Sequence, residues 1–356
     1  MEGKMIAKHK HLKKFSQKFP LVLLSCLFLC VPINIGLHAQ GFNIPTGRWG
    51  ISFGNSKRFT GLRFNFRDSR VEKITGINVT LWQPKKDNKE SIVHGLSLGL
   101  MPGGGELRGI QIGGLGIAAE QNMSGISIGL LGVGCGGDMT GVHIGGLGAG
   151  AGGSIKGLNI GILGIGAGED LGGINIGGLG AGAGGDMSGL NVGLLGVGAG
   201  SDLSGINIGG FGAGAGKNMA GLNIGLFGIG AGENLTGINI GGLGAGAGEE
   251  LRGLTICGLG AGSPKIKGVT FAGLCVGGVN VRWIALAIGT VQIKNDGHLI
   301  GFAASGFNYI KGTQHGLSIG IVNYAFRLKG VQLGLINIVR ENPKGLRILP
   351  IMNANF

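Results

Sequence analysis

Residues 157–172 read GLNIGILGIGAGEDLG, and this sixteen-residue unit recurs without insertion or deletion through the middle of the chain. The first glycine of each copy lies at Gly109, Gly125, Gly141, Gly157, Gly173, Gly189, Gly205, Gly221, Gly237 and Gly253. A period this strict indicates that neighbouring units stack in register, because a slipped unit would displace its whole apolar pattern.

Within one unit the apolar residues fall at positions two and four, then seven, nine and eleven, then fifteen. A spacing of two is the period of a β-strand, and glycine occupies the places where the parity changes, as expected of turns. We therefore predict two or three short strands per unit. All six apolar positions are expected to face the interior, among them Leu163 at position seven.

The fold predicted from this pattern is all-β, a glycine-rich 16-residue-repeat β-solenoid in which each unit forms one coil. About seventeen coils at 4.7–4.9 Å each would give a rod about 80 Å long. The alternative is an outer-membrane antiparallel β-barrel, in which each unit is one strand and a turn. The terminal Phe356 favours the barrel. Turns that are equally short at both strand ends, and a lumen lined by glycine, count against it.

The chain divides into four segments. Residues 1–39 are expected to be a secretory signal peptide, because six lysines precede an apolar run from Pro20 that ends in the small-residue exit before Gln40. Residues 40–108 are a cap of degenerate repeats, residues 109–268 hold the regular repeats, and residues 269–356 form a second degenerate cap. Together, residues 40–356 make one continuous repeat domain. The degenerate units are expected to begin at Gly61, Gly76, Gly95, Gly268, Gly316, Gly330 and Gly345.

Position three of the unit is polar, and in a strand it is expected to face outward. Stacking would bring its side chains into a ladder of amide hydrogen bonds about 4.8 Å apart. The ladder residues are Asn159, Asn175, Asn191, Asn207, Asn223 and Asn239. On this interpretation Asn159→Ala alone is expected to cost little stability.

Position fourteen carries an acidic or amide side chain in most copies, for example Asp170, Asp186 and Asp202. A turn-capping role is the favoured interpretation. Calcium binding is the alternative, although each coil offers one such ligand and calcium takes six to eight oxygens. The sequence leaves calcium binding open.

We find no arrangement of residues that predicts catalysis, and we predict no catalytic, cofactor-binding or metal site and no cofactor. The glycine-rich runs are followed by further strands and not by helices, so they do not indicate a nucleotide site. The cysteines expected in the mature chain, Cys135, Cys257 and Cys275, replace small residues and suggest no disulfide framework. Residues 109–263 hold three Lys/Arg against nine Asp/Glu. Nucleic acid is therefore excluded as a partner of the repeat face.

The C-terminal units read GLSIGIVN at 316–323 and GVQLGLIN at 330–337, and the chain ends NPKGLRILPIMNANF at 342–356. This pattern resembles a family of uncharacterised bacterial surface-repeat proteins built from glycine–apolar–Gln/Asn–apolar–glycine units. The likeness covers most of the mature chain, but residues 109–263 depart from it in replacing the trailing asparagine by glycine. The resemblance implies export to the cell surface or outer membrane of a bacterium with an outer membrane, and it implies no activity.

Two classes of function follow. The first is a non-enzymatic, exported cell-surface or envelope repeat protein that acts as a structural scaffold or an adhesive surface. The second is an outer-membrane β-barrel that passes or binds a solute. The partner is unknown, and the outer membrane and other envelope components are the candidates that the expected localisation offers.

Overall fold

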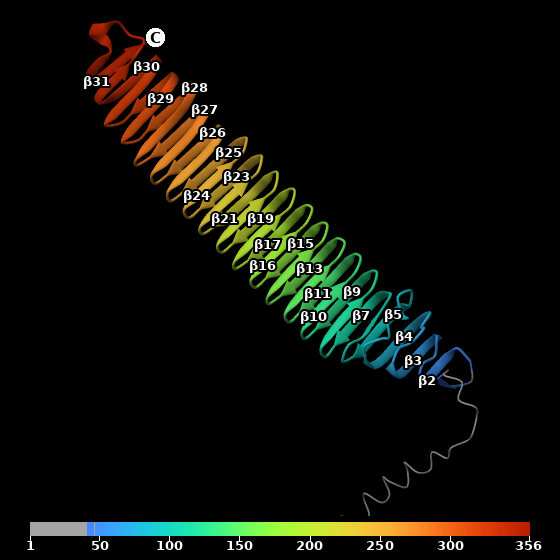
Figure 1. Cartoon of the computed structure of the whole chain (residues 1–356). Coiled ribbons are helices and arrows are strands. Elements are labelled where there is room, and N and C mark those ends of the chain that lie inside the picture. Colours follow the sequence, from blue (N-terminus) through green and yellow to red (C-terminus); the bar gives the residue numbers. More distant parts are fainter. Residues whose placement is uncertain (1–40, 46) are drawn as a thin grey trace, which may run out of the picture. The chain divides into compact units, whose positions relative to one another are not determined.

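The computed structural model describes residues 41–45 and 47–356, so the expected signal peptide lies outside the described residues. Residues 41–356 form one compact unit. It is a β-solenoid of about seventeen turns, with coils stacked along one axis from β2 to β31 (Figure 1). The predicted all-β solenoid is confirmed.

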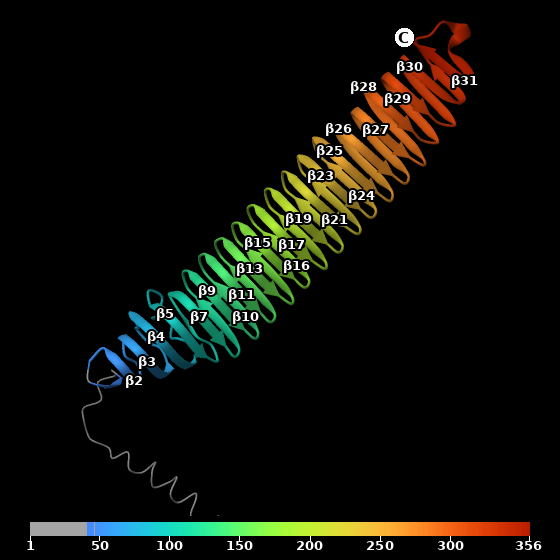
Figure 2. The ribbon, with the colours of Figure 1, turned by 180° about the vertical axis from the view of Figure 1, so that it is seen from behind.

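Each regular coil consists of a long strand and a short strand on opposite sides of a flattened turn, as the two opposite views show (Figures 1 and 2). The long strands are β7 (Glu106–Gly113), β9 (Met123–Gly129), β11 (Met139–Gly145), β13 (Ile155–Gly161), β15 (Leu171–Gly177), β17 (Met187–Gly193), β19 (Leu203–Gly209), β21 (Met219–Gly225), β23 (Asn234–Gly241) and β25 (Glu250–Cys257). The short strands are β8 (Gly116–Ala119), β10 (Gly132–Cys135), β12 (Gly148–Ala151), β14 (Gly164–Ala167), β16 (Gly180–Ala183), β18 (Gly196–Ala199), β20 (Gly212–Ala215), β22 (Gly228–Ala231) and β24 (Gly244–Ala247).

Strands of successive coils pair in parallel and in register. Gly157 lies opposite Gly141 on one side and Gly173 on the other, sixteen residues away in each direction. An outer-membrane barrel requires antiparallel neighbours along its whole circumference. The barrel alternative is therefore wrong, and the pore that it implied has no basis in this fold.

The glycine at position one sits where the long strand bends. Gly173 has φ +104°, and a Cβ placed on it would lie 2.2 Å from the carbonyl oxygen of Gly157 in the preceding coil. A side chain at this corner meets both an unfavourable backbone conformation and the neighbouring coil. This explains why position one is glycine in every regular copy.

The interior is narrow and is lined by positions three, five, nine, eleven and fifteen. Position fifteen supplies its largest side chains, Leu or Met in most coils, and Leu171 and Met187 have no exposed surface. Position nine adds smaller residues such as Ile165 and Ala181. Position five is glycine in all regular coils but the last, because a Cβ on Gly161 would lie 2.4 Å from the carbonyl oxygen of Gly164 in the same coil. The last regular coil holds the buried Cys257 there.

The prediction of which residues face inward is therefore partly wrong. Positions nine and fifteen are buried as expected, and position eleven is buried or nearly so. The apolar residues at positions two, four and seven face outward, and Leu163 is 49% exposed. Successive side chains of the long strand point to opposite sides, and Leu171, at its start, is buried. Positions three and five therefore point inward, and positions two and four point to solvent.

The N-terminal end comprises less regular coils. Its strands are β1 (Phe42–Ile44), β2 (Trp49–Phe53), β3 (Arg58–Arg67), β4 (Lys73–Trp82), β5 (Ile92–Gly99) and β6 (Gly103–Gly104). Gly61, Gly76 and Gly95 occupy the position-one corner as predicted, and Gly50 adds a further coil before them. The short strand β1 pairs antiparallel with β2 and ends the stack.

At the C-terminal end the two strands of a coil merge into longer ones. These are β26 (Gly260–Ala272), β27 (Cys275–Ala287), β28 (Thr290–Ala304), β29 (Phe307–Ile319) and β30 (Val322–Val339). The corner column continues through Gly268, Trp283, Gly301, Gly316 and Gly330. The predicted unit at Gly345 is wrong, because this glycine lies in the 3₁₀ helix η1 (Lys344–Leu346). The last strand, β31 (Ile348–Asn355), pairs antiparallel with β30 and closes the stack.

Candidate functional site

The asparagines of position three form a hydrogen-bonded ladder inside the solenoid. Each side-chain amide donates to the side-chain oxygen of the next coil at 2.8–2.9 Å from Asn159 to Asn239, and Asn239 reaches Thr255 at 3.5 Å. All of these side chains are fully buried. The six predicted residues are thus brought together, but the expected outward orientation is wrong.

The polar column at position three continues beyond the asparagines towards both ends. In register it contains Asn43, Ser52, Arg63, Asn78, Ser97, Gln111, Ser127 and His143 on the N-terminal side, and Thr270, Ser318, Gln332 and Asn353 on the C-terminal side. Ala285 and Ala303 interrupt it. A buried polar group is tolerated when it is hydrogen-bonded, and for the asparagines and Ser127 stacking supplies the partner from the adjacent coil. The hydroxyls of Ser97 and Thr270 have no partner among the described residues.

His143 breaks the ladder. Both of its ring nitrogens are buried without a hydrogen-bond partner, and so is the side-chain oxygen of Asn159 in the next coil. Burial lowers the pKa of His143 to about 4, because the charged imidazolium is not stabilised in this interior. The neutral imidazole therefore separates the Ser127–Gln111 hydrogen bond from the asparagine ladder.

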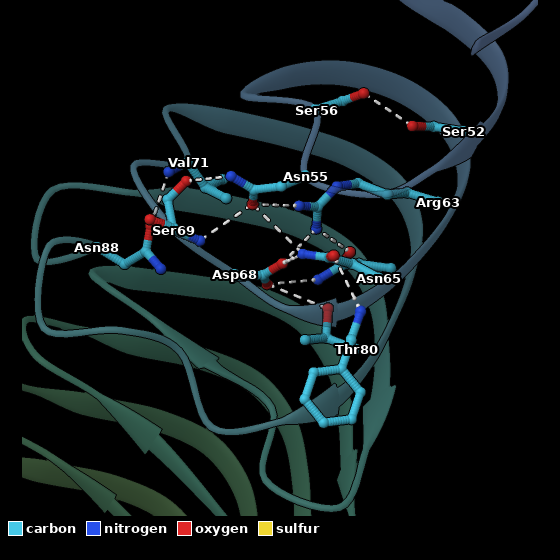
Figure 3. A network of polar contacts seen from close by, with 12 residues as sticks. Ser52, Asn55, Ser56, Arg63, Asn65, Asp68, Ser69, Val71, Thr80 and Asn88 are labelled. Carbon is cyan, nitrogen blue, oxygen red and sulfur yellow. Dashed lines mark hydrogen bonds and ion pairs between the residues drawn. The ribbon is translucent and has the colours of Figure 1, made fainter. Parts of the chain in front are cut away.

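At the N-terminal end the column holds a buried ion pair. The Arg63 guanidinium donates to Asp68 at 2.6 Å and to Asn78 at 2.8 Å, and its side chain has no exposed surface. Thr80 and Asn65 also donate to Asp68, at 3.1 and 2.6 Å (Figure 3). This network joins successive coils where the regular repeat has not yet begun. The sequence gives no sign of this network, because Arg63 looks like one of many surface cations.

A second inner column near the C-terminus uses the trailing asparagines of the degenerate units. Asn308 donates to Asn323 at 2.7 Å, and Asn323 donates to Asn337 at 2.8 Å, with all three buried. They occupy the inner position that Ala261 and its counterparts hold in the regular coils. The structural role of the trailing asparagine is thus a ladder between coils.

The acidic and amide residues at position fourteen form an exposed edge. The Asp170 carboxylate accepts the backbone N–H of Asp186 at 2.9 Å, and Asp186 accepts that of Asp202 at 3.1 Å. These hydrogen bonds join adjacent coils. The sequence had predicted instead that each position-fourteen side chain caps its own turn. Among residues 41–45 and 47–356, no three His, Cys, Asp or Glu side chains lie together as a metal site.

The long strands and the turns that follow them present a largely aliphatic face to solvent. Leu, Ile, Val or Phe fills positions two, four and seven of every regular coil. Those at position two are Ile110, Ile126, Val142, Leu158, Ile174, Leu190, Ile206, Leu222, Ile238 and Leu254. In alternate coils a further large residue stands at position six, and these four are 64–68% exposed: Leu130, Ile162, Leu194 and Leu226. We call positions two, four, six and seven of the regular coils the aliphatic face.

The short strands present a different surface, made of glycine backbone. Positions eight and ten are glycine in nearly every regular coil, and a Cβ placed on Gly166 would meet no atom within 4 Å. The rod therefore has one broad apolar side and one side with almost no side chains. The contrast identifies the aliphatic face as the chemically distinctive surface of the regular repeats.

Two of the three described cysteines lie inside the coils. Burial raises the pKa of the Cys135 and Cys257 thiols to about 11, so neither forms a thiolate near neutral pH. Cys275 is exposed, and all three are free.

Comparison of the chain with protein-family models, with curated proteins and with solved structures gave no match. Within the part of the chain that the structure describes, no helix has both the length and the apolar character needed to cross a membrane. The surfaces of the solenoid are therefore the basis on which its function is inferred.

Proposed function

We propose that this protein is a non-enzymatic, exported repeat protein of the bacterial cell surface or envelope, acting as a rigid scaffold with an adhesive side. The observation that carries the proposal is the aliphatic face. A protein interior shelters such residues from water, and an exposed apolar stripe of this length indicates a surface that contacts something else.

The size of the aliphatic face supports contact with an extended partner. Ten coils at about 4.8 Å each and a width of about 15 Å give roughly 700 Å² of apolar surface. The largest apolar patch on a typical monomer is about 300–600 Å², and one partner in a standard interface contributes about 800 Å². The face is therefore large enough for stable attachment.

The architecture suits a scaffold because each coil is held by its neighbours alone. Parallel backbone hydrogen bonds, the asparagine ladder and the position-fourteen edge all run along the axis. Such one-dimensional stacking gives a stiff rod whose lateral surface repeats at every coil. Export is supported by the lysine-rich and apolar residues 1–39 and by the resemblance of the C-terminal units to bacterial surface-repeat proteins.

The adhesive role is tested by changing the exposed residues alone. In the variant L130S/I162S/L194S/L226S the four most exposed side chains of the face become polar while the interior is unchanged. The matched control G134S/G166S/G198S/G230S adds four hydroxyls to the glycine side of the same coils, where a Cβ meets nothing closer than 3.7 Å.

Binding is measured as protein deposited on alkyl-coated glass relative to bare glass. We expect the first variant to lose most of the deposit and the control to keep it. Equal deposits of the parent and the first variant would overturn the adhesive role. Export is tested separately, by mass spectrometry of the mature N-terminus and by protease treatment of intact cells. A chain that retains residues 1–39 in the cytoplasm would overturn the proposed localisation.

A further inference from the structure

Trp283 occupies a corner that is glycine in all the neighbouring coils. It lies in register between Gly268 and Gly301, and its φ of +91° falls in the region that favours glycine. Its side chain is 69% exposed. A backbone conformation unfavourable to tryptophan is combined here with an exposed indole, and such combinations collect at binding sites.

A groove of about 420 Å³ leads up to this indole. Its floor is the backbone of Gly253 and Gly268, the corner glycines of the two preceding coils. Trp283 closes its C-terminal end. The volume lies within the range of about 300–1,000 Å³ that small-molecule sites occupy.

The two walls of the groove differ in chemistry. Position sixteen supplies three stacked cations on one wall, Arg252, Lys267 and Arg282. Position two supplies Leu254 and Val269 on the other.

Charge at the groove is only partly compensated. Glu250 accepts hydrogen bonds from Arg252 Nε at 2.7 Å and from Lys267 Nζ at 2.8 Å. These bonds, that from Lys267 first, hold the pKa of the Glu250 carboxyl below its usual value. Among the residues that the structure describes, Arg282 forms no ion pair. Three cations and one carboxylate leave a net charge of +2, which favours an anionic ligand.

The aliphatic wall continues out of the groove. Ile256 and Phe271, at position four of the same two coils, are about 40% exposed and extend the apolar surface beyond Leu254 and Val269. A ligand with a hydrocarbon chain could therefore lie on the wall and continue onto the outer surface. A purely hydrophilic anion would leave the indole and this wall in water.

We propose that the groove between the cation row and Trp283 binds an anionic amphiphile, such as a fatty acid or an anionic lipid. Its carboxylate or phosphate lies against Arg282 and Lys267, and its hydrocarbon chain covers Trp283, Leu254 and Val269. The site shares Leu254 with the end of the aliphatic face, but it depends on the cation row and Trp283, which the adhesive role of that face does not require.

The experiment uses the fluorescence of Trp283. The chain has two other tryptophans, Trp49 and Trp82, both exposed, and their replacement by phenylalanine leaves Trp283 as the sole indole. The probe is sodium dodecanoate below its micellar concentration, followed by a bromine-labelled fatty acid as a contact quencher. We expect a blue shift with dodecanoate, quenching with the bromine-labelled acid, and no response to acetate or dodecanol.

Three variants, made in the same two-phenylalanine background, separate binding from folding. Trp283→Gly restores the corner residue of the other coils, so we expect a melting temperature equal to or above the parent's together with loss of binding by calorimetry. Arg282→Gln is expected to weaken binding about tenfold. Lys156→Gln removes a cation at the same coil position, but in a place where the corner of the next coil is Gly173 and not a tryptophan. This control variant should leave the affinity unchanged.

The source of the amphiphile is distinguished with vesicles. Binding to phosphatidylcholine vesicles that contain phosphatidylglycerol, and not to phosphatidylcholine alone, would assign a membrane lipid. Binding to monomeric dodecanoate without vesicle binding would assign a free fatty acid. An unchanged emission with every probe, equal affinity for dodecanol, or undiminished binding by Trp283→Gly would overturn the proposal.

Discussion

The side-chain amide of Asn159 donates a 2.9 Å hydrogen bond to the side-chain oxygen of Asn175 in the next coil, and neither side chain has any exposed surface. The same bond repeats at each following asparagine, so one polar column runs through the interior of the rod. A buried amide is costly without partners, and here each partner comes from another coil. The ladder therefore couples correct stacking to the satisfaction of buried polar groups.

Removing one rung of the ladder should destabilise the stack. In Asn191→Ala, Asn175 loses its acceptor and Asn207 loses its donor. Each buried polar group left without a partner costs about 1–3 kcal/mol, so the two together should lower the free energy of unfolding by roughly 2–6 kcal/mol. Thermal melting followed by circular dichroism would show this, with Ser188→Ala, an exposed position of the same strand, as the control. Parent-like melting of Asn191→Ala would show that the ladder contributes no stability.

Completing the ladder should stabilise the protein. In His143→Asn the new amide can donate to the side-chain oxygen of Asn159, which has no partner in the described structure. The change also removes two buried ring nitrogens that lack partners. We expect a gain of about 1 kcal/mol and a higher melting temperature. A lower melting temperature would mean that the imidazole packs well enough to outweigh its unmade hydrogen bonds.

His143 should also make stability depend on pH. Its pKa is lowered by burial to about 4, against 6.5 for the unperturbed side chain. As the pH falls, His143 is therefore protonated in the unfolded chain before it is protonated in the folded protein. Its effect on the free energy of unfolding is most favourable above about pH 6.5, and this stability is lost as the pH falls towards 4. The shift corresponds to roughly 3 kcal/mol. The melting temperature of His143→Asn should exceed that of the parent by more at pH 4.5 than at pH 7.5, and a constant difference would contradict the assignment.

The sequence predicted the architecture because the repeat itself is a structural constraint. A sixteen-residue period without insertion requires every coil to have the same path, and spacing of two within each unit requires strands. The recurrence of glycine at position one was also visible in the sequence, and Gly173 shows its reason, because the preceding coil leaves no room for a Cβ there. These features can be predicted because they depend only on the residues of one unit and on the repetition of that unit along one axis.

The side that each residue faces could not be predicted in the same way. Apolar residues usually mark the interior, but backbone atoms leave little room for a side chain at position five, which is glycine in all regular coils but one. Asn159 finds an acceptor for its side-chain N–H only through stacking. Positions two and four therefore turn outward. The Arg63–Asp68 pair and the Trp283 groove were missed for a related reason, because each depends on residues that only coil stacking brings together. A tryptophan in place of a corner glycine was the available signal for the groove.

The final prediction separates the two sides of the coil with one substitution on each. Leu171→Asp places a carboxylate where the native side chain is fully buried, which should unfold the adjacent coils, at a cost of several kcal/mol. Leu163→Asp places the same group where the leucine is 49% exposed, so its cost should stay near 1 kcal/mol or less. Amide hydrogen exchange of β13 to β16 would report both, with rapid exchange expected only in Leu171→Asp. Equal loss of protection in both variants would show that position seven is interior after all, and with it that the aliphatic face is not a free surface.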